Sequence, residues 1–266
     1  MNNTFEKSQN LKAYFMLVCA TLFWAGNFNV GKFAFIENIS PFTLAFLRWL
    51  LVWIILMPLT YREILSLKNI IFKNFKLLFI LGATSVFLFT ALTYKALNYT
   101  QVINASLFNT AIPATIILVC FLLKIEKTNI FQLSGLLIST LGILVIITKL
   151  DLDILLSLDF NTGDLFMVAA IISWGVYSAF LKKRNFEISL LALVQIICTF
   201  GLLMLTPAFF IELNQGNSIN VNLNLIYILL YVAIYPSIGS YYCWAGAVSI
   251  IGPNSCLLYT SDAADE

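Results

Sequence analysis

Long runs of apolar residues dominate the chain, and short polar connections separate them. A helix that spans a membrane needs about 20 mostly apolar residues. Eight runs meet this requirement, and we expect each to form a spanning helix: Lys12–Phe35, Pro41–Leu59, Lys76–Tyr94, Val102–Leu123, Ile130–Thr148, Asp164–Leu181, Ile188–Ile211 and Leu223–Ser249. The pattern therefore predicts an all-α integral membrane protein.

The composition supports this class. Apolar residues make up 61% of the 266 residues and charged residues 11%, against about 45–50% and about 25% in soluble domains. The chain has no histidine, which excludes imidazole proton relays and histidine-ligated metals, and we expect no metal or other cofactor. The cysteines show no Cys-x-x-Cys spacing and are interpreted as small buried hydrophobic residues: Cys19, Cys120, Cys198, Cys243 and Cys256.

The first apolar run is interpreted as a retained helix, because no small-residue cleavage site follows it. Basic residues gather at one set of helix ends, which predicts a cytoplasmic N-terminus by the positive-inside rule. The expected inner residues are Lys7, Lys12, Arg62, Lys68, Lys73, Lys76, Lys124, Lys127, Lys182, Lys183 and Arg184. The expected outer edges carry only Lys32, Lys95 and Lys149, and Arg48 lies within a helix.

The sequence repeats itself at a shift of about 150 residues. The matching pairs are Trp24 with Trp174, Gly26 with Gly175, Ile39-Ser40 with Ile188-Ser189 and Pro58 with Pro207. Five helices precede the second copy, so the two copies would enter the membrane in opposite senses, as in many secondary transporters. We expect a first repeat at 1–149, an outer connection at 150–163 and a second, partial repeat at 164–254.

The stretch from Leu22 to Leu50 holds the end of one apolar helix, a turn at Glu37–Ser40 and the start of the next helix. Its sequence FWAGNFNVGKFAFIENISPFTLAFLRW resembles the opening signature of the EamA-like transporters of the drug/metabolite transporter superfamily. Three later stretches resemble further helices of that family: YKALNYTQVINASLFNTAIPATIILVCFLLKIEK, LSGLLISTLGILVI and ISWGVYSAFLKKR. The resemblance covers about residues 11–254. It implies ten helices in two inverted five-helix repeats, and export or exchange of amino acids or other small metabolites.

The second repeat departs from this pattern at its end. The family pattern predicts two more apolar helices after Gly252-Pro253, whereas the chain continues as NSCLLYTSDAADE. We therefore expect about eight complete helices, and we expect residues 255–266 to be a non-native tail on a C-terminally truncated protein.

Arg48 is the strongest candidate for a functional group, because an ionisable residue at membrane depth is costly unless it lines a cavity or finds partners. It lies about seven residues, or about 10 Å, into the second helix. Either it reaches to the outer headgroups or caps helix carbonyls, or it supplies a fixed positive charge for an anionic solute. For Lys32 and Lys95, which lie nearer the outer ends, reaching to the surface is the favoured interpretation.

Further polar and aromatic residues are candidate solute contacts. Trp24, Asn27 and Gly31 share one helical face, and Asn27 either bonds a neighbouring helix or contacts a solute. Asn104, Asn109 and Gln195 carry the same ambiguity. Tyrosines and tryptophans near helix ends commonly form an interfacial belt, but Trp174 and Tyr177 lie deeper and rank above Tyr94, Tyr241, Tyr242 and Trp244.

Two prolines interrupt predicted helices and are candidate gating positions. Pro113 and Pro236 each free a carbonyl that neighbouring groups must satisfy. Each is either a packing kink or a bend near the solute path. Gly239 and Ser240 beside Pro236 make the second position the better candidate.

No aspartate or glutamate lies well inside a predicted helix, which argues against a proton antiporter built on a buried carboxylate. A secondary transporter of small polar metabolites in the bacterial cytoplasmic membrane, with lipids and the solute as its partners and no nucleic acid, is the favoured function. A channel or packing subunit is the alternative. A membrane-embedded enzyme is disfavoured, because the sequence has neither histidine nor a Gly-x-Ser-x-Gly motif.

Overall fold

The computed structural model describes residues 2–125, some helical residues between 134 and 145, residues 161–216, residue 219 and residues 221–253. The predicted fifth helix, Ile130–Thr148, falls mostly outside these residues. So does most of the predicted connection 150–163, and the predicted tail 255–266 falls outside them entirely.

The described part of the chain contains seven helices that are long and apolar enough to cross a membrane. They are Gln9–Ile36, Pro41–Ser66, Phe75–Leu97, Val102–Leu122, Thr162–Lys182, Leu190–Asn214 and Leu223–Ile251. The prediction of an all-α integral membrane protein is confirmed. The predicted bounds hold to within a few residues, except that the second helix continues past Leu59 to Ser66.

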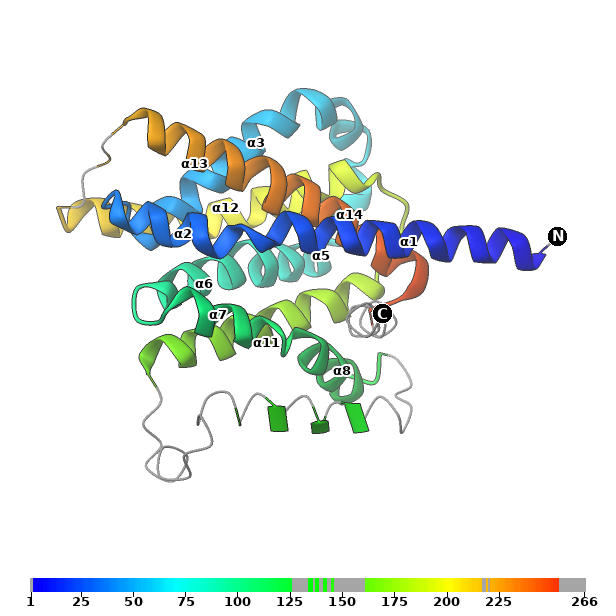
Figure 1. Ribbon diagram of the computed structural model, residues 1–266. Helices are drawn as coiled ribbons and strands as arrows, with labels where there is room; N and C mark the ends of the chain where they lie inside the picture. The colour runs from blue at the N-terminus through cyan, green and yellow to red at the C-terminus, as the bar shows by residue number, and fades with distance from the viewer. Residues whose placement is uncertain are drawn as a thin grey trace.

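Several spans are broken into shorter elements. α1 (Asn2–Ala25) and α2 (Asn27–Ile36) meet at Gly26, and α3 (Pro41–Ser66) is followed by α4 (Lys68–Lys73). The third span contains α5 (Phe75–Gly82), the π-helix η1 (Ala83–Phe89) and α6 (Thr90–Leu97), and the fourth contains α7 (Val102–Asn109) and α8 (Ile112–Leu122). Figure 1 shows α1 and α2 running in line across the bundle, with the start of α1 projecting beyond the other helices.

The second half of the described chain has the same character. α11 (Thr162–Lys182) and α12 (Leu190–Asn214) are continuous, and the last span contains α13 (Leu223–Ala233), the π-helix η2 (Ile234–Gly239) and α14 (Ser240–Ile251). The π-helices η1 and η2 begin 151 residues apart, at Ala83 and Ile234. This separation fits the repeat shift that the sequence predicts.

Helices α3 and α12 lie antiparallel, and a carboxylate joins them at each end. At one end, Glu212 near the C-terminus of α12 accepts hydrogen bonds from Ser40 Oγ (2.6 Å) and from the Thr43 backbone N–H (2.8 Å) at the start of α3. At the other end, Glu63 of α3 accepts from the backbone N–H (2.9 Å) and the hydroxyl (2.7 Å) of Ser189, the N-cap of α12. Each helix thus caps the free N–H groups of the other, where a negative charge also favours the helix dipole.

Glycines allow α12 to approach the third span closely. A Cβ atom on Gly201 would lie 2.2 Å from Val86 Cγ1, and one on Gly82 would lie 2.7 Å from the Ile197 carbonyl oxygen. Small residues at helix contacts are the usual way for membrane helices to pack, because lipid gives no hydrophobic driving force between helices. This contact holds η1 against the α3–α12 pair.

Candidate solute-binding site

Arg48 is buried in the middle of the bundle and does not reach the surface. Only 4% of its residue surface is exposed. Its guanidinium donates to Ser237 Oγ (2.6 Å), Tyr94 Oη (2.8 Å), the Pro236 carbonyl oxygen (3.0 Å) and Asn27 Oδ1 (3.2 Å). Reaching to the headgroups is therefore not what the structure shows. The bond to the Pro236 carbonyl agrees with the alternative that Arg48 caps helix carbonyls, and a contact with a solute stays a prediction. Arg48 lies among helices from the first two spans, the third span and the last span.

The charge of Arg48 is not neutralised by the described part of the chain. All four acceptors are uncharged, and no described carboxylate forms an ion pair with the guanidinium. A guanidinium has five N–H donors, so these bonds leave one N–H on Nη2 without an acceptor. The rings of Trp49 and Tyr94, 5.3 and 5.8 Å from Arg48 Cζ, add cation–π attraction. The site thus holds a buried net positive charge with a donor to spare.

The local sequence around Pro236 explains the acceptors. Proline has no N–H, so the carbonyl one turn earlier, that of Val232, loses its helical donor. Ser237 Oγ donates to the Val232 carbonyl instead, at 2.6 Å. The same hydroxyl accepts from Arg48 Nε. Both acceptors that η2 provides for Arg48, the Pro236 carbonyl and the Ser237 hydroxyl, therefore come from one Pro-Ser pair within the π-helix.

An aromatic cluster adjoins this polar network. Trp24 Nε1 donates to the Pro236 carbonyl oxygen at 3.1 Å, and its ring contacts Trp174 with 5.1 Å between centroids. Trp174 also contacts Tyr177 (4.8 Å) and Tyr241 (5.2 Å). The complete cluster comprises Trp24, Trp49, Phe89, Trp174, Tyr177, Tyr241 and Trp244.

The structure brings most of the sequence candidates together. Trp24, Asn27, Arg48 and Tyr94 share the polar network, and Trp174, Tyr177 and Tyr241 belong to the aromatic cluster. By contrast, Asn104 is exposed on α7. Gln195 is buried on α12, where its amide nitrogen is 3.5 Å from the Trp53 carbonyl oxygen, so it belongs to the α3–α12 contact. Asn109 is half-buried at the end of α7, and its Oδ1 has no hydrogen-bond partner among the described residues.

The candidate gating residues all lie at irregular helix positions. Pro113 lies in the first turn of α8, just after the break that separates α8 from α7. Pro236 and Gly239 lie in η2. A Cβ atom on Gly239 would lie 2.8 Å from the Phe23 ring, so η2 approaches α1 closely there.

Lys32 has a different environment from the one expected. Its Nζ donates to the Leu97 carbonyl oxygen at 2.7 Å and thereby caps the C-terminus of α6. The structure shows Lys32 half-buried and bonded to a helix end, and not reaching to the headgroups as predicted. Lys95 is half-buried and lies 5.8 Å from the ring of Tyr99.

Sequence reasoning missed Ser237, Trp49 and the two capping glutamates. Ser237 carried a signal, because a hydroxyl beside a proline inside an apolar helix is placed to replace the lost donor. Glu63 and Glu212 gave no such signal, because helix-end carboxylates are normally solvated. Glu212 is only 8% exposed.

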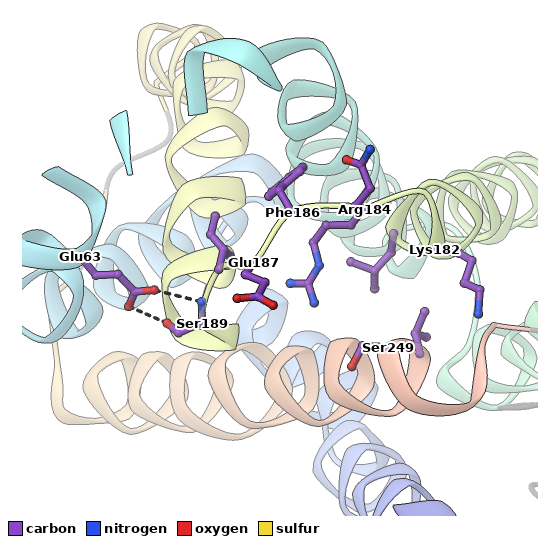
Figure 2. A pocket seen from close by; sticks show the side chains of 11 residues that line it. Glu63, Lys182, Arg184, Phe186, Glu187, Ser189 and Ser249 are labelled. Carbon is purple, nitrogen blue, oxygen red and sulfur yellow. Dashed lines mark hydrogen bonds between the residues drawn. The ribbon is translucent and has the colours of Figure 1, made fainter. Parts of the chain in front are cut away.

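A polar pocket of about 710 Å³ opens at the end of α11. Its lining includes Arg184, Glu187 and Ser249, together with the Glu63–Ser189 pair. Figure 2 shows the Arg184 guanidinium pointing into the pocket between Glu187 and Ser249. Arg184 Nη1 is buried and has no hydrogen-bond partner among the described residues, and this burial lowers the pKa of the guanidinium from its ordinary value.

These features define a multi-pass helical membrane protein with a cationic, aromatic-lined centre. The chain belongs to the EamA-like transporter family, whose model matches residues 11–148. It is 29% identical to an "Uncharacterized transporter" of Archaeoglobus fulgidus over 94% of this chain and 84% of that protein. It is 24% identical to the transporter YyaM of Bacillus subtilis over 94% of this chain and 82% of that protein. No solved structure matches the chain.

Proposed function

We propose that the protein is a secondary transporter that exports or exchanges small metabolites with a carboxylate group, such as amino acids, across the bacterial cytoplasmic membrane. The observation that carries the proposal is the buried Arg48, which among the described residues has only uncharged hydrogen-bond partners and leaves one N–H without an acceptor. Burying a charge without a counter-ion is costly. A solute carboxylate would relieve this cost, and a cationic solute would increase it.

The surroundings of Arg48 suit a small amphipathic solute. Solute sites are usually apolar and aromatic, with a few fixed polar groups that set orientation. Here Asn27, Tyr94 and Ser237 hold the guanidinium in place, and the aromatic cluster lies beside it. A carboxylate at Arg48 would leave an apolar side chain against those rings. No step of this proposal is catalytic, so it assigns no enzymatic activity.

Alternating access is the proposed mechanism. The antiparallel α3–α12 pair, the two capping glutamates and the two π-helices support a pair of inverted repeats that move against each other. The proposed orientation places the N-terminus, α4 and the pocket at Arg184 on the cytoplasmic side, in agreement with the charge distribution. Under this orientation, Glu212 ties α3 to α12 at the outer end and Glu63 ties them at the inner end.

Counterflow separates this function from the channel alternative. Liposomes that contain the purified protein and 10-fold excess unlabelled L-leucine or L-phenylalanine would be diluted into a trace of the labelled amino acid. A transporter gives transient, saturable accumulation of label, and the methyl esters, which lack the carboxylate, should neither accumulate nor compete. Flux that rises linearly with concentration would favour a channel. Absence of any carboxylate-dependent flux would overturn the proposed function.

A further inference from the structure

The last part of α11 and the loop after it carry a row of three hydrogen-bond donors that the described protein leaves unused. Trp174 Nε1, Tyr177 Oη and Arg184 Nη1 are all buried and have no hydrogen-bond partner among the described residues. At about 100° per residue, Trp174 and Tyr177 lie within about 60° of one another around the axis of α11, and Arg184 lies two residues after the helix ends at Lys182. Trp174 and Tyr177 are 1% and 0% exposed.

Unsatisfied buried donors are uncommon. Three of them within eleven residues of the chain therefore call for an explanation. Indole and guanidinium groups donate and do not accept hydrogen bonds. These donors are therefore complementary to a ligand that has hydrogen-bond acceptor oxygens.

The two ends of the row meet the two features described above. At one end Trp174 contacts Trp24, which shares the Pro236 carbonyl with Arg48. At the other end Arg184 points into the 710 Å³ pocket (Figure 2). With a rise of about 1.5 Å per residue, α11 extends about 12 Å from Trp174 to its end at Lys182, and Arg184 follows two residues later. The row therefore joins the pocket to the buried site.

The connection is closed in this structure. Leu181 and Val248 line the inner part of the pocket, and both are buried. One turn closer to the centre, Trp244 Nε1 donates to Ser178 Oγ at 3.2 Å and holds α14 against α11. Movement of α14 away from α11 would break this bond and open the face that carries Tyr177.

We propose that Trp174 and Tyr177 of α11, together with Arg184 in the loop after it, form the inner half of the solute path, and that the pocket at Arg184 is an access site that receives carboxylate solutes before they reach Arg48. This inference rests on the proposed function and adds a second binding site to it. Arg184 captures the carboxylate, and Tyr177 and Trp174 offer successive donors toward the centre.

Cysteine protection tests the access site without measuring transport. Ser249→Cys would be introduced after replacing the native cysteines by serine, and the protein would be placed in phosphatidylcholine liposomes. We expect L-leucine and L-phenylalanine at saturating concentration to slow maleimide labelling of this cysteine at least threefold, and their methyl esters to have no effect. Arg184→Gln should abolish the protection. The matched control is Lys183→Gln, an exposed cation stacked on Phe180 in the same loop, which should retain it.

Lipid is the other source of an anionic group near a membrane surface. If Arg184 serves a lipid phosphate, labelling would slow when phosphatidylglycerol is added and would not respond to the amino acids. That result would overturn the inference. Equal protection in the Arg184→Gln and Lys183→Gln variants would also overturn it.

The donors themselves are tested by substitution. Tyr177→Phe removes only a hydroxyl, whereas Trp174→Phe removes the N–H together with part of a ring that packs in the aromatic cluster. Each should raise the half-saturation concentration for counterflow at least threefold. The Tyr177 hydroxyl has no hydrogen-bond partner among the described residues, so Tyr177→Phe should leave the thermal unfolding midpoint unchanged or higher. A half-saturation concentration equal to that of the wild type in both variants would contradict the role of Tyr177 and Trp174 in the solute path.

The outcomes separate this inference from the proposed function. If counterflow remains saturable and depends on Arg48 but not on Arg184, Tyr177 or Trp174, the inference fails and the proposed function stands. If the wild type shows no counterflow, the proposed function fails.

Discussion

Arg48 and Trp24 donate hydrogen bonds to the same atom, the carbonyl oxygen of Pro236, at 3.0 and 3.1 Å. A charged donor from α3 and a ring donor from α1 thus converge on one irregular turn of η2. This turn connects the polar network to the aromatic cluster. Its geometry depends on Ser237, which satisfies the Val232 carbonyl and accepts from Arg48.

Removing the Ser237 hydroxyl should therefore destabilise the protein and disturb Arg48. Ser237→Ala leaves the Val232 carbonyl and Arg48 Nε without their partners in a fully buried place. We expect a loss of about 1–3 kcal/mol in the free energy of unfolding, measured as a lower thermal midpoint in detergent. Ser66→Ala is the matched control, because Ser66 is exposed and donates only within its own helix. Equal midpoints for the two variants would contradict this role of Ser237.

The contact between α12 and η1 predicts a rescue experiment. Gly201→Ala would place a methyl group 2.2 Å from Val86 Cγ1, and such overpacking typically costs about 1–3 kcal/mol. Val86→Ala removes the atoms that the new methyl meets. The double variant should therefore recover part of the lost thermal stability. If it is less stable than the sum of the two single variants predicts, the close approach seen here is wrong.

The two capping glutamates should contribute unequally to the stability of the protein. Glu212 is 8% exposed and accepts from a backbone N–H and two hydroxyls, whereas the Glu63–Ser189 pair is exposed to solvent. Hydrogen bonds to charged groups contribute about 1.5–3 kcal/mol when buried. Glu212→Gln should lower the unfolding midpoint more than Glu63→Gln does. A larger drop for Glu63→Gln would show that the Glu63–Ser189 contact stabilises the protein more than the contacts of Glu212 do.

The proposed orientation is tested by labelling. In a background without native cysteines, Lys68→Cys at the start of α4 and Gln101→Cys before α7 should react with an impermeant maleimide from opposite sides of the membrane. Both positions lie at span ends. Reaction of both from the same side would contradict a membrane crossing by the third span, which lies between the two positions, and reaction of Lys68→Cys from outside would reverse the orientation.

The sequence predicted the seven described spans well, because each needs only a long apolar run. It also selected Trp24, Asn27, Arg48 and Trp174 as candidates, because polar or aromatic groups at membrane depth are conspicuous. It could not decide between the two interpretations of Arg48. That choice depends on which acceptors η2 brings to the guanidinium, and η2 lies almost 190 residues later in the chain.

Two candidates lie away from the polar network for a common physical reason. Asn104 was selected by residue type, but the rotation of α7 leaves it exposed. Gln195 was selected in the same way and instead serves the contact between α12 and α3. The capping role of Glu212 requires α3 and α12 to lie antiparallel with their ends level. No local sequence pattern predicts this arrangement of the two helices. Helix rotation and register come from packing between segments far apart in sequence.

The most direct test of the central claim is the affinity of the purified protein for a carboxylate solute in Arg48 variants. Counterflow half-saturation for L-leucine and L-phenylalanine would be measured for the wild type, Arg48→Lys, Arg48→Ala and Arg62→Ala, the last being an exposed arginine on the same helix. Losing one partner of a desolvated charge pair costs about 2–5 kcal/mol, so Arg48→Ala should raise half-saturation more than tenfold. Arg48→Lys should recover only part of the affinity, because lysine lacks the planar fork, and Arg62→Ala should match the wild type. Wild-type half-saturation in a folded Arg48→Ala protein would contradict the claim that Arg48 binds the solute.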